Sequence, residues 1–231
     1  MNRAAIVTGA GSGIGRAVVQ MLSAHGFDVV LAGRHRASLR ETGATLKGEW
    51  LDVEADMATE SDILRLIDAA VERFGRVDAL VNNAAVAPTA PIDRIELGSI
   101  EQAFRVNCAG PMLLVSRLWE TLKSQGGGRI VNISSMATVD PFAGLAVYAA
   151  SKGAMNTFTR AIANEGRRAG IMAFAVAPGA VETKMLRSIV DEKSLPRSKT
   201  LRPEDIARVV LACVSGERDA DNGGVILVPS P

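Results

Sequence analysis

An apolar run and a glycine-rich turn follow one another near the start of the chain, in AAIVTGAGSGIG (residues 4–15). The run from Ala4 to Thr8 has the composition of a buried strand, and the segment from Gly13 to His25 has the pattern of a helix. Glycine permits a tight turn and lets the backbone approach a pyrophosphate, which the positive end of the helix dipole stabilises. The turn therefore predicts a dinucleotide site at Gly9, Ser12, Gly13, Ile14 and Gly15. The alternative is a purely structural turn.

Short apolar runs alternate with longer amphipathic stretches along the rest of the chain. Further strands are expected at residues 28–32, 48–55, 77–81, 129–133, 171–176 and 225–228. Helices are expected at 61–74, 99–124, 148–167 and 203–214, whereas the basic stretch 34–47 has no clear pattern. Alternation of this kind predicts parallel strands with right-handed crossovers, and strands that are apolar throughout predict a sheet covered on both faces. We therefore expect a single α/β domain over residues 1–231, with a doubly wound, mostly parallel seven-stranded sheet and helices on both faces.

The composition narrows the class of protein. The chain has 231 residues, is 48% hydrophobic and 22% charged, and carries a formal net charge of +1, which gives no indication of nucleic acid or a membrane surface as a partner. Cys108 and Cys213 lie in apolar helix-like segments, which favours buried thiols over a disulfide. No apolar run reaches the roughly 18 residues that cross a bilayer, and we expect no signal peptide before the first strand. We expect a cytoplasmic protein, and His25 and His35 have no neighbours that would complete a metal site.

The residues after the second expected strand indicate the type of dinucleotide. A carboxylate there would bond the ribose 2′-hydroxyl and repel a 2′-phosphate. The chain has Gly33-Arg34-His35-Arg36 instead, and Arg34 can make charge-assisted hydrogen bonds to a 2′-phosphate. NADP(H) is therefore favoured over NAD(H), the alternative being an ordinary solvated basic loop.

Tyr148 and Lys152 are spaced by one helical turn, and Ser135 lies thirteen residues before the tyrosine. A phenol is a weak acid with an ordinary pKa of about 10. A lysine at i+4 would place a positive charge beside the phenol and lower that pKa toward the range of a proton-transfer catalyst. A serine hydroxyl from another segment could hold a substrate oxygen against the phenol. An isolated YxxxK pair is more often an ordinary helix start, so its meaning depends on the other motifs.

Taken in order, these motifs resemble the short-chain dehydrogenase/reductase family in its compact single-domain branch, over about residues 4–228. The turn has TGxxxGxG spacing, and Asn82-Asn83-Ala84-Ala85 is similar to the NNAG motif, with Ala85 in place of its glycine. The resemblance implies a Rossmann-like fold and places Asp56 at the adenine amino group with Met57 beside it, Asp52 being the alternative. It also places Asn83 and Ala84 beside the cofactor, and Pro178, Gly179 and Thr183 at the carboxamide end of the nicotinamide.

The same resemblance implies a mechanism. Tyr148 exchanges a proton with the substrate oxygen, while Lys152 lowers the pKa of the phenol and bonds the nicotinamide ribose. Ser135 polarises the substrate oxygen as a neutral donor, and the thirteen-residue interval favours it over the adjacent Ser134. Asn107, through a local helix distortion, positions a water molecule that links Lys152 to solvent.

The expected function is an NADP(H)-dependent oxidoreductase that interconverts a secondary alcohol and a ketone or aldehyde, such as a 3-oxoacyl-type or other small carbonyl compound. The alternatives are a non-catalytic NADP(H)-binding sensor or scaffold with the same fold, and the same chemistry with NAD(H). The expected partners are the small-molecule substrate and further copies of the chain, because helices 99–124 and 148–167 resemble those that pair in homodimers and homotetramers of the family.

Residues 184–202 are expected to form a lid over the substrate. This segment is basic, with Lys184, Arg187, Lys193, Arg197, Lys199 and Arg202 against Asp191 and Glu192. The excess would favour an anionic substrate, such as an acyl thioester on a carrier, although a solvated mobile loop is the more common explanation.

Overall fold

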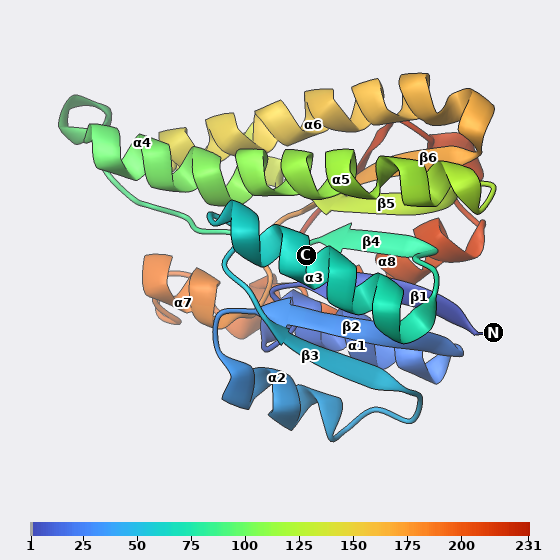
Figure 1. Cartoon of the computed structure of the whole chain (residues 1–231). Helices are drawn as coiled ribbons and strands as arrows, with labels where there is room; N and C mark the ends of the chain where they lie inside the picture. Colours follow the sequence, from blue (N-terminus) through green and yellow to red (C-terminus); the bar gives the residue numbers. More distant parts are fainter. Residues whose placement is uncertain (1) are drawn as a thin grey trace.

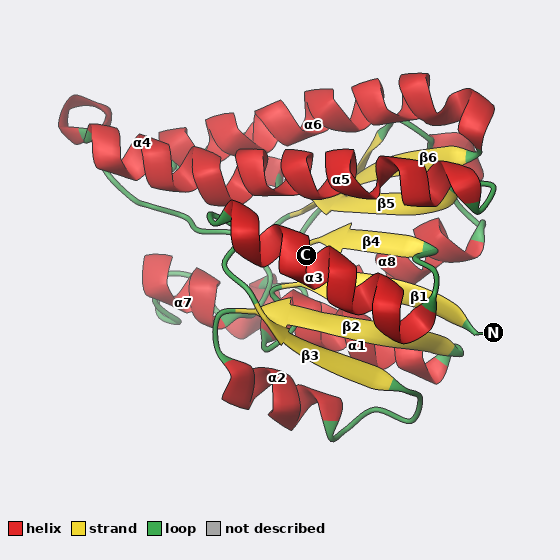
Figure 2. Ribbon diagram, in the orientation of Figure 1, coloured by secondary structure: helices red, strands yellow, loops and turns green. Residues whose placement is uncertain are grey.

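Parallel strands form one sheet between two layers of helices (Figure 2). The computed structural model describes residues 2–231, and within them the sheet has seven strands in the order β3-β2-β1-β4-β5-β6-β7, every neighbouring pair parallel. The strands are β1 (Arg3–Thr8), β2 (Phe27–Gly33), β3 (Trp50–Glu54), β4 (Ala79–Asn82), β5 (Gly128–Ile133), β6 (Ile171–Pro178) and β7 (Val225–Val228). The expected doubly wound seven-stranded fold is confirmed, and the sheet is parallel throughout.

Each face of the sheet has its own apolar core. Successive strand side chains point to opposite faces, so Val29 and Leu31 of β2 enter one core and Val30 enters the other. Helices α1 (Gly13–Ala24), α2 (Arg36–Gly43) and α8 (Pro203–Ser215) cover the first face; α3 (Glu60–Phe74), α5 (Gly110–Ser124) and α6 (Ala146–Gly166) cover the second (Figure 1). The short helices α4 (Leu97–Phe104) and α7 (Lys184–Ile189) lie beyond the carboxyl ends of the strands (Figure 1).

The segment expected to be one helix over residues 99–124 is instead divided. A π-helical turn, Arg105–Ala109, separates α4 from α5. Pro111 has no N–H to donate to the carbonyl of Asn107, so the regular helical ladder cannot pass this point. Gly110 lets α5 approach the loop after β3, because a Cβ there would lie 2.1 Å from the carbonyl oxygen of Met57.

Two further helices differ from the expectation. The basic stretch after β2 contains α2, and the lid contains α7, neither of which the residue pattern indicated. The buried residues of α3 are Ile63, Leu66, Ile67 and Ala70, whereas Leu64 is 39% exposed.

The strand order places the candidate site. The order reverses between β1 and β4, and in open parallel sheets the crevice at such a point, outside the carboxyl ends of the strands, receives the ligand. Within residues 2–231, no helix is long and apolar enough to cross a membrane. The same residues contain no group of three or more His, Cys, Asp or Glu side chains that could hold a metal ion.

Candidate active site

A cavity of about 630 Å³ opens at the carboxyl ends of the strands. It is lined by the glycine turn, by the loops that follow β2 to β6, and by α7. Of the residues expected at the site, those that line it are Gly9, Ser12, Gly13, Ile14, Arg34, Asp56, Met57, Asn83, Ala84, Ser135, Tyr148, Lys152, Pro178, Gly179 and Thr183. Gly15 and Asn107 lie behind the wall rather than in it.

The glycine turn has the shape that a pyrophosphate requires. Gly9 and Gly13 have φ angles of +68° and +51°, which other residues rarely adopt. A Cβ on Gly15 would lie 2.2 Å from the carbonyl oxygen of Gly9, so Gly15 permits the turn to fold onto α1. Ser12 is the N-cap of α1 but makes no side-chain capping bond, which leaves the first N–H groups of the helix available for an anion.

Asn83 holds this turn from the next strand. Its amide nitrogen donates to the carbonyl oxygens of Thr8 (2.9 Å) and Gly9 (3.3 Å). The Thr8 hydroxyl oxygen accepts in return from the backbone N–H groups of Asn83 and Ala84, both at 3.0 Å. The Asn83 side chain therefore fixes the turn, and Asn83 itself lines the cavity.

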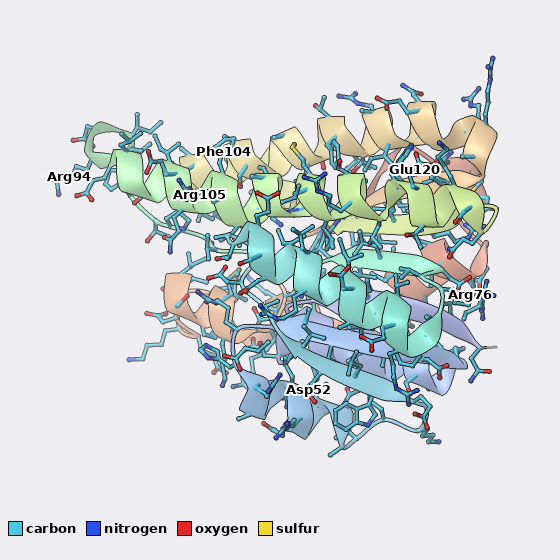
Figure 3. All side chains as sticks on the ribbon, viewed as in Figure 1. Asp52, Arg76, Arg94, Phe104, Arg105 and Glu120 are labelled. Carbon is cyan, nitrogen blue, oxygen red and sulfur yellow. The ribbon has the colours of Figure 1, made fainter. Side chains whose placement is uncertain are left out.

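Arg34 differs from the neighbouring arginines in having no ion pair among the described residues. Arg36 and Arg40 both form ion pairs with Asp52, at 3.1 and 3.4 Å, at the β3 edge of the sheet (Figure 3). Arg34 lines the cavity, is exposed, and has no ion pair within residues 2–231. Asp56 lines the cavity and Asp52 does not, which favours Asp56 of the two candidates for the adenine.

Lys152 is buried beneath the reaction end of the cavity. Its ammonium group donates to the carbonyl oxygen of Ile133 at 2.6 Å and lies 5.7 Å from the centre of the Tyr148 ring. Burial lowers the pKa of Lys152 to about 8, an effect that the nearby Cys108 thiol partly opposes. The amine therefore remains mainly protonated at neutral pH.

Burial outweighs the lowering of the Tyr148 pKa that was expected from Lys152. Burial raises the pKa of Tyr148, and a hydrogen bond with Ser135 lowers it in part. The phenol is thus neutral at pH 7, which is the form that can donate a proton to a substrate oxygen. Ser135 caps a short 3₁₀ turn (Met136–Thr138), where its hydroxyl oxygen accepts from the N–H of Ala137 at 3.1 Å.

Asn107 lies in the π-helical turn, and its side chain makes three hydrogen bonds. Its amide oxygen accepts from the N–H of Val86, while its nitrogen donates to the carbonyl of Val86 and to the Ser151 hydroxyl, all at 2.9 Å. These bonds connect the loop after β4 to α6. The role of Asn107 in positioning a water molecule stays a prediction.

The carboxyl end of the chain holds the loop after β6. The N–H of Gly179 donates to the carbonyl of Val228 at 2.9 Å, and the N–H of Ala180 donates to the Ser230 hydroxyl at 2.8 Å. A Cβ on Gly179 would lie 2.5 Å from that hydroxyl oxygen, so only glycine allows this approach.

Sequence reasoning missed several residues of the site. Six apolar residues that line the cavity belong to no motif, and only their position in the fold identifies them: Val86, Met136, Phe142, Leu145, Met185 and Ile189. Asn156 was not predicted either, although its i+4 spacing from Lys152 places it on the same face of α6.

Comparison with known proteins agrees with this geometry. A family model described as short chain dehydrogenase matches residues 3–194. An uncharacterized oxidoreductase of Listeria monocytogenes is 29% identical over 231 residues, 95% of this chain and 93% of its own. Another, from Staphylococcus epidermidis, is 30% identical over 209 residues, 90% of this chain and 89% of its own.

Solved structures show the same architecture over nearly the whole chain. A 3-ketoacyl-(acyl-carrier-protein) reductase from Brucella melitensis, complexed with NADH, superposes with a TM-score of 0.92 at 30% identity and covers 98% of this chain and 96% of its own. Levodione reductase superposes with a TM-score of 0.93 at 27% identity, with the same coverage of both chains. The chain therefore belongs to the short chain dehydrogenase family, the NAD(P)-dependent oxidoreductases that its motifs resemble.

Proposed function

We propose that the protein is an NADP(H)-dependent oxidoreductase that interconverts a secondary alcohol and a ketone or aldehyde, with Tyr148 as the proton donor and acceptor. The observation that carries the proposal is that a neutral Tyr148, Ser135 and a buried, protonated Lys152 share one cavity with an open glycine turn at a helix N-terminus. A bound nicotinamide would supply the hydride that reduces the carbonyl carbon.

In the reductive direction the protein's own groups act on the carbonyl oxygen. The Ser135 and Tyr148 hydroxyls donate hydrogen bonds to it, so they stabilise the negative charge that develops there. Tyr148 then transfers its proton to the oxygen, and the Lys152 ammonium stabilises the phenolate that remains.

The proposal is tested by replacing the phenol hydroxyl. A panel of ketones and alcohols is assayed with NADPH or NADP⁺, with NAD(H) as the comparison, by the nicotinamide absorbance. Tyr148→Phe should lower kcat by about 10²-fold or more while the dissociation constant of NADPH changes little. Turnover that survives this substitution would refute the catalytic assignment. Retained NADPH binding with no turnover of any panel member by the unaltered protein would favour the sensor alternative.

The preference for NADP(H) depends on Arg34. Its guanidinium has no carboxylate partner within residues 2–231 and faces the adenosine end of the cavity. Arg34→Ala should weaken NADPH binding about tenfold or more and leave NADH binding unchanged, measured by titration of cofactor fluorescence. Arg36→Ala, which removes a cation already paired with Asp52, is the matched control. Tighter binding of NADH than of NADPH by the unaltered protein would overturn the preference.

We also propose that the chain forms a homodimer or homotetramer. Ile100 and Phe104 on α4 each leave 37% of their surface exposed in the single chain. A monomer in light scattering at micromolar concentration would contradict this proposal.

A further inference from the structure

The cavity that Tyr148 lines has a group of apolar side chains in its wall. These side chains come from the loop after β4, the segment before α6, and α7: Val86, Met136, Phe142, Leu145, Met185 and Ile189. Three of these keep much of their surface in water, Phe142 at 71% and Met185 and Ile189 at 37% each. Apolar side chains left exposed around a concave site indicate a ligand that covers them.

Five of the six cations of the lid do not line this cavity. Arg187 forms an ion pair with Glu182 and donates to the carbonyl oxygen of Leu195 at 2.8 Å. Arg197 pairs with Glu192 at 3.2 Å. Lys184 is the one basic residue of segment 184–202 that lines the cavity, and it is exposed.

The base of the lid is closed by backbone hydrogen bonds. The N–H of Leu201 donates to the carbonyl of Ala180 at 2.8 Å, and the N–H of Glu182 donates to the carbonyl of Leu201 at 2.9 Å. Thr183 caps α7 by accepting from the N–H of Leu186 at 3.2 Å. These bonds fix the lid's two ends, so that the apolar residues of α7 are held toward the cavity while Arg187 is held away from it.

We infer that the substrate is an uncharged carbonyl compound with an apolar substituent that contacts Phe142 and α7. The inference rests on the proposed function, because it concerns the reaction end of the same cavity. It replaces the anionic substrate that the basic composition of the lid suggested.

The test compares matched neutral and anionic ketones. Reduction of 2-alkanones of increasing length should show kcat/KM rising roughly two- to fourfold for each methylene until the cavity is filled. A keto acid that carries a carboxylate at the far end of the same chain should have a kcat/KM at least about tenfold lower than its methyl ester, because Lys184 is the only cation of segment 184–202 that lines the cavity, and its side chain is exposed to solvent. A preference for the keto acid, particularly one that Lys184→Ala abolishes, would overturn the inference.

Substitutions on α7 locate the apolar contact. Ile189→Ser and Met185→Ser should reduce the gain per methylene and leave the turnover of the shortest ketone least affected. Leu64→Ser, which removes a similarly exposed apolar side chain on α3, is the control and should change neither. A gain per methylene that survives both α7 substitutions would place the contact elsewhere and refute the inference. If the unaltered protein reduces no ketone and oxidises no alcohol with either cofactor, the proposed function itself fails.

Asn156, one helical turn beyond Lys152, holds the segment that carries Ser135. Its amide oxygen accepts from the Ser134 hydroxyl at 2.6 Å, and its nitrogen donates to the Thr138 hydroxyl at 3.2 Å. The Thr138 hydroxyl donates in turn to the carbonyl oxygen of Ser135 at 2.9 Å. Ser135 is thus held from both sides by one amide on the helix that also carries Tyr148 and Lys152.

We propose that Asn156 is a positioning residue that sets the Ser135 hydroxyl against Tyr148, whichever carbonyl compound is the substrate. Asn156→Ala should lower kcat roughly tenfold with the KM for cofactor unchanged, since a small displacement of the donor weakens the bond to the developing charge. Asn164→Ala, an exposed asparagine on the same helix, is the matched control.

Repeating the substitution in a Ser135→Ala protein distinguishes an effect on the position of Ser135 from a general loss of stability. In a Ser135→Ala protein, Asn156→Ala should have almost no further effect on kcat, because the group that it positions is already absent. An undiminished tenfold effect in that background, or an effect on Tm without any on kcat, would refute the proposal.

Discussion

Tyr148 is the only tyrosine of the chain, so its ionisation can be followed without interference from another phenol. Burial raises the pKa of its hydroxyl, and the bond from Ser135 opposes that rise. We expect the absorbance of the phenolate near 295 nm to titrate with a midpoint above the ordinary value of about 10 in the cofactor-free protein. Ser135→Ala should move the midpoint higher still. A midpoint below that ordinary value would mean that Lys152 dominates, as the residue spacing alone suggested.

Lys152 predicts the pH dependence of carbonyl reduction. Its pKa is lowered by burial to about 8, so the stabilising positive charge is present below that pH and is lost above it. The kcat/KM for the ketone, which reports groups of the free enzyme, should be constant below about pH 8 and then fall up to tenfold per pH unit. Cofactor binding measured over the same range separates this effect from loss of NADPH. A kcat/KM that stays constant up to pH 10 would contradict the predicted role of the Lys152 charge.

At the scale of the element, the junction of α4 and α5 depends on two adjacent residues. Pro111 interrupts the helical ladder, and Gly110 brings the start of α5 against Met57, which lines the cavity. The π-helical turn between the helices buries Asn107 against Val86 and Ser151. The break between α4 and α5 therefore brings α5 against Met57 in the cavity wall. It also lets Asn107 bond to Ser151 on α6.

A single methyl group tests this close approach. Gly110→Ala should lower the free energy of unfolding by about 2 kcal/mol or more and weaken NADPH binding, because its Cβ would meet the Met57 carbonyl oxygen at 2.1 Å. Gly153→Ala is the control within α6: its Cβ would have no atom within 4 Å, so it should stabilise the protein by about 1 kcal/mol. Chemical denaturation measures both changes. Equal effects of the two substitutions would show that the contact with Met57 is not tight.

The elements differ in how far the sequence predicted them. The apolar strands and the long helices have enough residues to show a period, and their predicted positions agree with the structure to within a few residues. The exception is the helix expected over residues 99–124, which is divided at the π-helical turn. Helices α2 and α7 have eight and six residues, too few for a clear repeat, and were missed. The motif residues were predicted to lie together and they do, except that Gly15 and Asn107 stand behind the cavity wall. The orientation of the Arg187 side chain relative to the cavity could not be predicted. It depends on an ion pair with Glu182 and on a hydrogen bond to the carbonyl of Leu195, which exist only in the folded lid.

At the scale of the whole molecule, the last residues of the chain return to the site. Ser230 bonds the backbone of Ala180 beside Gly179, fifty residues away in sequence. Ser230→Ala should raise the KM for cofactor roughly three- to tenfold with a small change in kcat, and lower the free energy of unfolding by about 1 kcal/mol. Ser215→Ala, an exposed serine at the end of α8, should change neither. An unchanged cofactor KM in the Ser230 variant would show that the loop keeps its position without this bond.

The lid has a property that matters for how such an enzyme acquires new substrates. Its ends are joined at Ala180, Glu182 and Leu201, and its arginines at 187 and 197 are neutralised by carboxylates of the same loop or of its base. A loop that is closed at its base can change its tip at little entropic cost to the rest of the fold. The residues of the lid can therefore change during evolution without a change in the rest of the site. Selection can alter the side chains over the carbonyl while the proton-transfer residues and the glycine turn stay the same.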